Sequence, residues 1–292
     1  MRMTVLRLKI DACTTEQFCE HISKSLKGDK LFKVVKINTE FLQRSLCDDQ
    51  YTKVLNSFDL NIADGRGVLW AARYLTLPIS KNKFIRTIQA VYQMIYSGAS
   101  IVLYPKFVKY PIPEAIPGVE AFKLVLQTAV SEKAKFFLFG SPQATLDPAY
   151  KNICKEYPNL NIVGKLNGYD FWNDKSINPV EIINKSGAKI VTVAMGSPKQ
   201  EYWINDNKDK LKNVRFAVGE GGTYTRIAFP SQKAPKFINR IGCEWIWRFL
   251  FNKSETASRN RFQRVWNAVP LFIYQVIKWK IKNGQTKVSN NE

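Results

Sequence analysis

The sequence predicts an α/β fold: a Rossmann-like parallel sheet sandwiched by helices, with a C-terminal helical appendage that associates with a membrane. Two observations predict the sheet. Short apolar runs alternate with amphipathic helical segments, and several runs end in glycine or in a polar side chain. Such alternation favours parallel strands joined by right-handed crossovers. A third observation, the basic and aromatic composition after Pro235, predicts the appendage, and docking of residues 259–282 on the sheet domain is the alternative to contact with a membrane. We therefore expect an α/β core over residues 1–235 and the appendage over 236–292.

The expected elements follow from apolar periodicity and from breaks at glycine and proline. Strands are expected at 3–10, 32–37, 60–63, 135–139, 160–164, 190–194 and 214–218, the first of them at an edge. Helices are expected at 14–27, 40–47, 51–56, 68–74, 121–132, 144–157 and 179–185, with a further helix beginning at Lys199. Residues 78–117 resemble an insertion, in which 87–105 form an amphipathic helix followed by a strand.

The composition restricts the class of protein. The 292 residues can bury a substantial core. Five scattered cysteines without a Cys-x-x-Cys pair, and a single histidine, argue against a disulfide framework or a zinc site and indicate a reducing cytoplasm. We expect no signal peptide and no spanning helix, because no uncharged apolar stretch of about 18 residues occurs.

The net charge of +20 is concentrated in two segments. Residues 236–292 hold 11 Lys/Arg against 3 Glu, and residues 81–113 hold five Lys/Arg and no acid, which together give +8 and +5. Localised positive charge indicates an anionic partner such as lipid phosphate, nucleic acid or a nucleotide. A solvated basic face is the alternative.

Two of the expected strands end in polar side chains. The run 60–63 stops at Asp64 and continues into Gly65, while the run 32–37 is followed by Asn38 and Thr39. Ligands of open α/β sheets bind at the carboxyl ends of the strands. We therefore predict one shared site at this edge, with Asp64 as its candidate general base.

Asp64 and Thr39 also have a structural interpretation, in which each caps a helix. Asp64 would cap the helix near Val68, and Thr39 the helix that starts at Glu40. The spaced Asp-x-Asp pair expected of a metal-dependent sugar transferase is absent, so no metal site is expected.

Glycine turns follow three further strands. Glycine lets backbone amides approach a diphosphate, and a helix N-terminus favours negative charge. A tight turn without a ligand is the alternative for each turn, but three at one sheet edge predict a nucleotide site. The turns are Gly140-Ser141-Pro142, Gly196-Ser197-Pro198 and Gly219 to Gly222. After the second, Lys199, Gln200 and Glu201 open a helix, where they either contact a sugar or diphosphate or serve as ordinary first-turn residues.

The most specific elements of the chain are Pro198-Lys199-Gln200-Glu201 and Glu244-Trp245-x-x-Arg248. Together with the strand-end residues they resemble the WecG/TagA/CpsF glycosyltransferase family, in order and spacing from about residue 5 to 264. The other matching pieces are Asn38-Thr39-Glu40, Ala63-Asp64-Gly65, Tyr157-Pro158-x-Leu160, Gly164, Gly168-Tyr169, Gly219-x-Gly221-Gly222 and Ala234-Pro235.

The resemblance implies an inverting, metal-independent enzyme without a cofactor. It would transfer a sugar of the N-acetylmannosamine type from a UDP-sugar to a polyprenyl-diphosphate-linked sugar. The enzyme would act in the cytoplasm, peripherally on the inner face of the cell membrane, in the synthesis of teichoic acid, capsule or another cell-surface polysaccharide. The expected partners are the donor, the acceptor and an anionic membrane surface, and no nucleic acid.

The resemblance also implies roles for residues. Asp64 and Thr39 are the expected catalytic residues, and the arginines of the appendage would close over the diphosphate and hold the enzyme on the membrane. The expected substrate-binding residues are Asn38, Gly65, Gly140, Gly196, Pro198, Lys199, Gln200, Glu201, Gly219, Gly221, Gly222, Arg248, Arg259, Arg261 and Arg264.

The chain departs from the family pattern at three positions. Ala115 and Lys233 stand where the family usually has arginine, and Glu120 replaces an aspartate. The departures leave the donor sugar open. They also make a membrane-peripheral scaffold without catalysis an alternative to the enzyme. A nucleic-acid-binding module that uses the basic aromatic tail is a further alternative.

Overall fold

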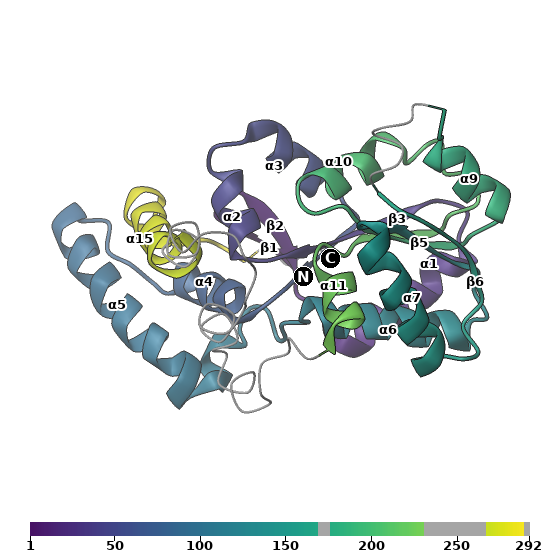
Figure 1. The fold of residues 1–292 in the computed structure, drawn as a ribbon. Coiled ribbons are helices and arrows are strands. Elements are labelled where there is room, and N and C mark those ends of the chain that lie inside the picture. Colours follow the sequence, from purple (N-terminus) through teal and green to yellow (C-terminus); the bar gives the residue numbers. More distant parts are fainter. Residues whose placement is uncertain (169–175, 231–266, 289–292) are drawn as a thin grey trace.

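The computed structural model describes residues 1–168, 176–230 and 267–288. Within these residues a six-stranded sheet runs in the order β4-β3-β8-β7-β5-β6, and its strands pair in parallel (Figure 1). The predicted parallel α/β sheet is therefore confirmed. The strands are β3 (Phe32–Ile37), β4 (Leu60–Ala63), β5 (Phe136–Gly140), β6 (Ile162–Leu166), β7 (Ile190–Ala194) and β8 (Phe216–Gly219).

Helices cover both faces of the sheet, because side chains alternate between two apolar cores along each strand. In β3, for example, Val34 belongs to one core and Val35 to the other. The first core lies under α1 (Thr15–Lys27), α6 (Gly118–Ser131), α7 (Gln143–Glu156) and α11 (Thr223–Ala228). The second lies under α2 (Thr39–Ser45), α3 (Asp49–Asn56), α9 (Pro179–Ser186) and α10 (Lys199–Asp206).

The prediction of one edge strand at 3–10 is wrong. Residues 2–11 form a hairpin of β1 (Arg2–Val5) and β2 (Leu8–Asp11), which is a separate two-stranded antiparallel sheet. The chain turns at Leu6, whose φ of 54° lies in the left-handed region. The turn holds no glycine or proline, so the alternating pattern runs through it without a break.

The strand predicted near the end of 87–105 is also wrong. After α4 (Arg66–Thr76), helix α5 (Lys83–Leu103) continues to Leu103 and is followed by the 3₁₀ helix η1 (Pro105–Val108). The β-branched residues Ile101 and Val102 favour a strand locally. Packing against α4 decides otherwise, and Arg66 Nη1 donates to the Ile101 carbonyl at 3.2 Å.

Part of the expected appendage is described. Helix α15 (Phe272–Asn283) packs on α4 and α5, and buries Phe272 and Val276. Lys280 of α15 is fully buried, and its Nζ donates to the Tyr74 carbonyl and to Gln93 Oε1. Burial, together with the charge of Arg73, lowers the pKa of Lys280 to about 7. The described end of the appendage is thus docked on the α/β core; residues 236–266 lie outside the described residues.

None of the described helices combines the length and the apolar character that crossing a membrane requires. The cysteines Cys13, Cys19, Cys47 and Cys154 are free. The boundary between a core and an appendage near residue 235 stays a prediction.

Candidate active site

Strands β3 and β8 are neighbours, but the chain leaves them toward opposite faces of the sheet, into α2 and α11 respectively. Such a topological switch point opens a crevice at the carboxyl ends of the strands, where ligands of α/β proteins bind. Asn38 and Thr39 follow β3, and Asp64 follows its other neighbour, β4. The predicted shared edge is therefore present.

Asp64 faces the start of α6. Its backbone N–H donates to the Ile37 carbonyl at 2.7 Å, and its Oδ1 accepts from the Gly118 N–H at 3.2 Å. The N-cap of helix α4 is Gly65, and the helix has no side-chain cap, so the interpretation of Asp64 as the cap of that helix is wrong. The positive end of the α6 dipole instead lies at the carboxylate and favours a negative charge there.

Thr39 lies at the same carboxyl edge of the sheet as Asp64. Asn38 is the N-cap of α2, since its side chain accepts from the N–H groups of Glu40 and Phe41 at 2.9 and 3.2 Å. The interpretation of Thr39 as that cap is therefore wrong. The Thr39 side chain packs on the first turn of α4, where a Cβ on Gly67 would stand only 2.8 Å from Thr39 Cγ2. Thr39 and Asp64 thus flank the same turn.

A buried ion pair lies behind Asp64, and the candidate site residues did not include it. Lys36 Nζ is 2.5 Å from Glu220 Oε2 and donates to the Gly118 carbonyl at 3.3 Å. A Cβ on Gly118 would stand 3.4 Å from Asp64 Oδ2 and 3.8 Å from both Lys36 Nζ and Thr223 Oγ1. The Asp64 carboxylate and the Lys36 ammonium therefore both lie at the first residue of α6, and Glu220 pairs with that ammonium.

Burial raises the pKa of Glu220, and the negative charge of Asp64 adds to the rise, while Lys36 opposes it. Glu220 Oε1 is buried without a hydrogen-bond partner in the described residues. The sequence signals for this pair are the two lysines that interrupt the apolar strand β3, Lys33 and Lys36, and an acid between glycines. A charged residue in such a position is buried only when a partner neutralises it.

Gln200 holds the turn after β8. Its Oε1 accepts from the Gly221 N–H at 2.9 Å, and its Nε2 donates to Glu201 Oε1 at 2.6 Å. A Cβ on Gly219 would stand 2.5 Å from Gln200 Nε2, so only glycine fits there without movement. Gln200 is buried, and contact between Gln200 and substrate stays a prediction.

Glu201 is an interior acid. Burial raises its pKa to about 7, although hydrogen bonds from Gln200 and Ser197 oppose the rise. Ser197 also shares a 2.6 Å hydrogen bond with the Tyr51 hydroxyl of α3. Tyr51, Ser197, Glu201 and Gln200 therefore form one polar network from α3 to the turn after β8.

The remaining glycine turns lie along the same edge. Gly140 ends β5 and Gly196 follows β7, and the connections α7 and α10 of these adjacent strands also leave toward opposite faces. The φ of Gly140 is 108°, and a Cβ there would meet the Ala194 carbonyl at 2.6 Å. Lys199 is exposed in the first turn of α10 beside them. Three glycine turns, each next to a switch point, thus lie along one edge of the sheet.

Other predicted residues are placed as follows. Gly65, with φ 103°, directly follows Asp64, and Gly222 precedes α11. Ala115 is partly buried against a core, and Glu120 lies in the first turn of α6. Pro198 precedes α10. The arginines Arg248, Arg259, Arg261 and Arg264, and Lys233, lie outside the described residues.

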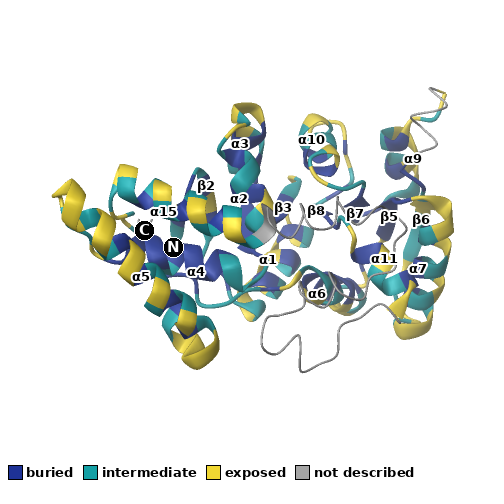
Figure 2. Ribbon diagram, turned by 60° about the vertical axis from the view of Figure 1, so that its left-hand side comes forward, coloured by how far each residue is buried: buried dark blue, intermediate teal, exposed yellow. Residues whose placement is uncertain are grey.

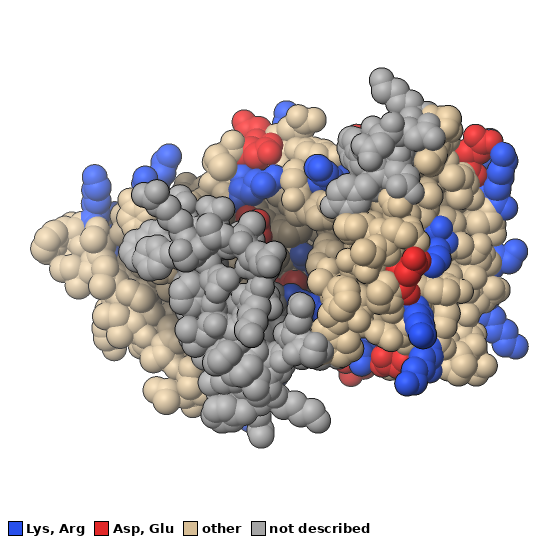
Figure 3. All heavy atoms as spheres, viewed as in Figure 1, with Lys and Arg blue, Asp and Glu red and all other residues tan. Residues whose placement is uncertain are grey.

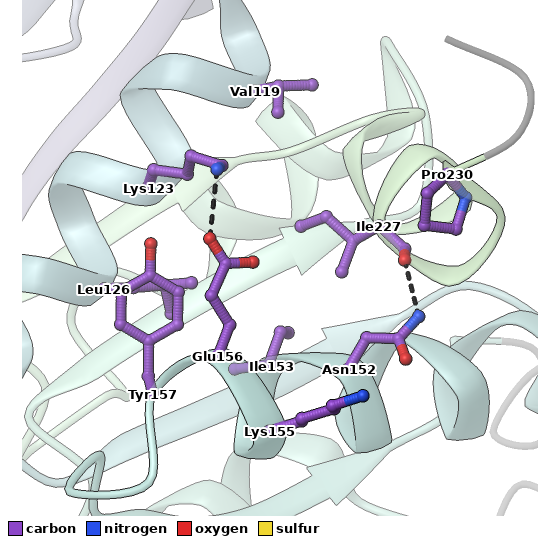
Figure 4. A pocket seen from close by; sticks show the side chains of 10 residues that line it. All are labelled: Val119, Lys123, Leu126, Asn152, Ile153, Lys155, Glu156, Tyr157, Ile227 and Pro230. Carbon is purple, nitrogen blue, oxygen red and sulfur yellow. Dashed lines mark hydrogen bonds and ion pairs between the residues drawn. The ribbon is translucent and has the colours of Figure 1, made fainter.

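A surface hollow of about 340 Å³ lies elsewhere, between α6, α7 and α11 (Figure 4). The Lys123–Glu156 ion pair, 3.0 Å long, and the 2.8 Å hydrogen bond from Asn152 to the Ile227 carbonyl lie at its walls. None of the predicted site residues lines it. A separate hollow in the middle of the molecule has acidic and basic side chains at its walls (Figure 3).

Comparison with known proteins assigns this architecture to a family. The model of the glycosyl transferase WecG/TagA/CpsF family matches residues 3–93 and 79–286. The chain belongs to this family. The resemblance inferred from the strand-end residues and the Pro-Lys-Gln-Glu element is thereby confirmed.

Two relatives are similar over nearly the whole chain. Both are described as N-acetylglucosaminyldiphosphoundecaprenol N-acetyl-beta-D-mannosaminyltransferase, from Staphylococcus aureus strains NCTC 8325 / PS 47 and MRSA252. They are 24% and 23% identical over 289 residues, which cover 98% of this chain and 96% of each relative.

Proposed function

We propose that this protein is an inverting, metal-independent glycosyltransferase. It moves a sugar of the N-acetylmannosamine type from a UDP-sugar to a polyprenyl-diphosphate-linked sugar in the synthesis of teichoic acid, capsule or a related cell-surface polysaccharide. Membership of the family and the acceptor named for the relatives support the proposal. The observation that carries it is the position of Asp64 at the carboxyl end of β4, one strand from the β3/β8 switch point, where Asp64 and Thr39 flank the first turn of α4.

In the proposed reaction Asp64 removes the proton from a hydroxyl of the acceptor sugar. The hydroxyl oxygen then attacks the anomeric carbon of the donor, a new C–O bond forms on the opposite face, and UDP departs with the electron pair of the broken bond. General-base assistance of this kind is worth about 10²–10⁴-fold in rate. The hydrogen bond from the Gly118 N–H to Oδ1 orients the carboxylate at this edge.

Departure of UDP requires compensation of the diphosphate charge. Backbone amides in the turns at Gly140, Gly196 and Gly222, together with Lys199, are the candidates among the described residues. The appendage arginines Arg248, Arg259, Arg261 and Arg264 would complete this set. Among the described residues no group of three or more His, Cys, Asp and Glu could hold a metal ion, and the chelator arm below tests metal independence.

The lipid-linked acceptor implies a peripheral position on the inner face of the cell membrane, with the sugar-transfer site facing the cytoplasm. The net charge of +20 suits an anionic leaflet. The family match also favours the enzyme over the nucleic-acid-binding alternative.

The test is release of UDP from a panel of UDP-sugars, including UDP-N-acetylmannosamine, in the presence of an N-acetylglucosamine-diphospho-lipid. We expect release that depends on both substrates and that persists with a chelator. Protection against thermal unfolding by a UDP-sugar without any turnover would instead support the scaffold alternative, to which Ala115 and Lys233 point. Loss of turnover on chelation would refute metal independence.

A further inference from the structure

Helix α5 has its polarity inverted relative to an ordinary surface helix. Such a helix buries an apolar stripe and exposes polar residues. The buried face of α5 instead consists of Ala90, Gln93, Ser97 and Ser100. Its exposed face is apolar, with a stripe at helical spacing that comprises Phe84, Ile88, Val91, Ile95 and Val102.

The exposure of this stripe is large. Phe84 is 75% exposed, Ile95 60% and Val102 61%. Tyr92 and Leu103 extend the apolar surface beside the stripe. Helix α5 lies at the periphery of the molecule, at the end away from α7 and α9, and its outer side is exposed along much of its length (Figure 2). Soluble proteins rarely expose so continuous an apolar surface without a binding role.

The polar side of α5 is fixed inward by specific contacts. Trp70 Nε1 donates to Ser97 Oγ at 3.0 Å, and Gln93 donates to the Pro78 carbonyl at 2.7 Å while it accepts from Lys280 at 2.6 Å. A rotation of α5 that hides its apolar side would break these buried hydrogen bonds. The apolar side is therefore held outward by α4 and α15.

The charge around α5 indicates what covers it. Residues 81–113 carry five Lys/Arg and no acid. At the start of α5, Lys81 is exposed just before the helix and Lys83 is exposed as its first residue. Lys106 and Lys109 are exposed just after its end. A second copy of the chain would bring these like charges together, which disfavours self-association. An anionic bilayer surface offers acyl chains for the stripe and phosphates for the lysines at both ends.

Helix α5 is also connected to the candidate active site. Arg66, two residues after Asp64, donates through Nη1 to the carbonyl of Ile101 in the last turn of α5. The helix, about 32 Å long at 1.5 Å per residue, therefore ends beside the turn that carries Asp64. An acceptor diphosphate at the headgroup level would lie close to that turn.

We propose that the apolar face of α5 is a membrane-docking surface, which lies in the plane of an anionic bilayer and positions the Asp64 edge at the headgroups. The proposal rests on the proposed function for its link to catalysis, but the docking itself does not depend on transfer. The proposal gives the 78–117 segment a contact with the membrane, in addition to the contact expected of the C-terminal appendage.

The test compares Ile88→Glu/Ile95→Glu with a control of equal charge change, Asn159→Glu/Ile182→Glu, at exposed positions in the turn after α7 and in α9. Both variants and the wild type are floated with phosphatidylcholine vesicles, with and without phosphatidylglycerol. We expect binding of the wild type and the control to anionic vesicles, and a loss of about tenfold or more for the α5 variant. Circular dichroism and thermal unfolding check that the variant is folded.

Undiminished binding of the folded α5 variant, or absence of wild-type binding, would overturn the proposal. A wild-type dimer that the variant dissociates while vesicle binding persists would also overturn it, in favour of a second copy. UDP release with a water-soluble, short-chain acceptor separates the two proposals. The α5 variant should keep this activity and lose activity on a vesicle-embedded acceptor, whereas a wild type that binds vesicles without any UDP release would contradict the proposed function alone.

Discussion

Lys36 and Glu220 form an ion pair with a 2.5 Å Nζ–Oε2 distance, and their side chains are 6% and 0% exposed. The pair joins β3 to the residue that follows β8 at the switch point, and Lys36 Nζ and Asp64 Oδ2 both lie near Gly118. Without Lys36, the carboxylate of Glu220 would be buried with no compensating charge.

Lys36→Met should therefore destabilise the fold by about 3–5 kcal/mol, the usual effect of removing one partner of a buried pair. Lys36→Met/Glu220→Leu should recover much of this loss, because neither charge is then left buried. Urea unfolding measures both variants. The control is Lys185→Ala, which removes the exposed pair with Glu181 and should change little. Equal stability of Lys36→Met and the control would refute the structural role of the pair.

Asp64→Asn should lower kcat by about 10²–10⁴-fold, because the amide keeps the size of the side chain and cannot accept the proton. The fold should be retained, since Asn Oδ1 can still accept from the Gly118 N–H. UDP release measures the effect, and thermal unfolding checks the fold. Asp206→Asn, at an exposed position of α10, is the control and should keep wild-type turnover. Turnover of Asp64→Asn equal to that of the control would show that Asp64 is not the base.

Gly219→Ala should destabilise the protein by about 1–3 kcal/mol, the usual cost of overpacking. The added Cβ would stand 2.5 Å from Gln200 Nε2 and 3.1 Å from Glu201 Oε1, so both side chains would have to move. Gly98→Ala in α5 is the matched control, because its Cβ would meet nothing within 4 Å. It should be neutral or stabilising, as alanine usually is in a helix. Chemical denaturation of the two variants provides the comparison.

The stability of the protein should fall as pH rises from about 4.5 to about 7, on account of Glu201. The pKa of Glu201 is about 7 in the folded protein, against an ordinary value of 4.5 for a glutamate, so the folded state holds more protons in this window. The contribution is fully present below 4.5 and is lost as pH rises through 7. Glu201→Gln, which resembles the protonated acid, should remove this dependence and be the more stable protein at pH 8. Unfolding free energies of both proteins at several pH values test the sign. The prediction is contradicted if the stability of the wild type, relative to that of Glu201→Gln, rises between pH 4.5 and 7.

The pattern of single segments predicted most of the sheet. Apolar runs bounded by polar and glycine residues located the six strands and the edge at which Asp64, Asn38 and Gly196 lie, since burial on both faces requires continuous apolar residues. The same local reading failed at residues 3–10 and 87–105. There, a turn at Leu6 without glycine or proline and the packing of α5 on α4 outweighed local preference.

The sequence by itself determined the parallel α/β sheet, the acid at its carboxyl edge and membership of the glycosyltransferase family, because these depend on short apolar patterns and on residue order. Only the tertiary structure decided which polar groups meet. Lys36 and Glu220 are 184 positions apart and Gln200 and Gly221 are 21 apart, and each pair forms because the sheet order places β3, β8 and β7 side by side. The tertiary structure also decided that the apolar face of α5 points outward. The buried partners of Ser97 and Gln93 come from α4, from the segment after α4 and from α15, and the sequence of α5 alone does not specify them.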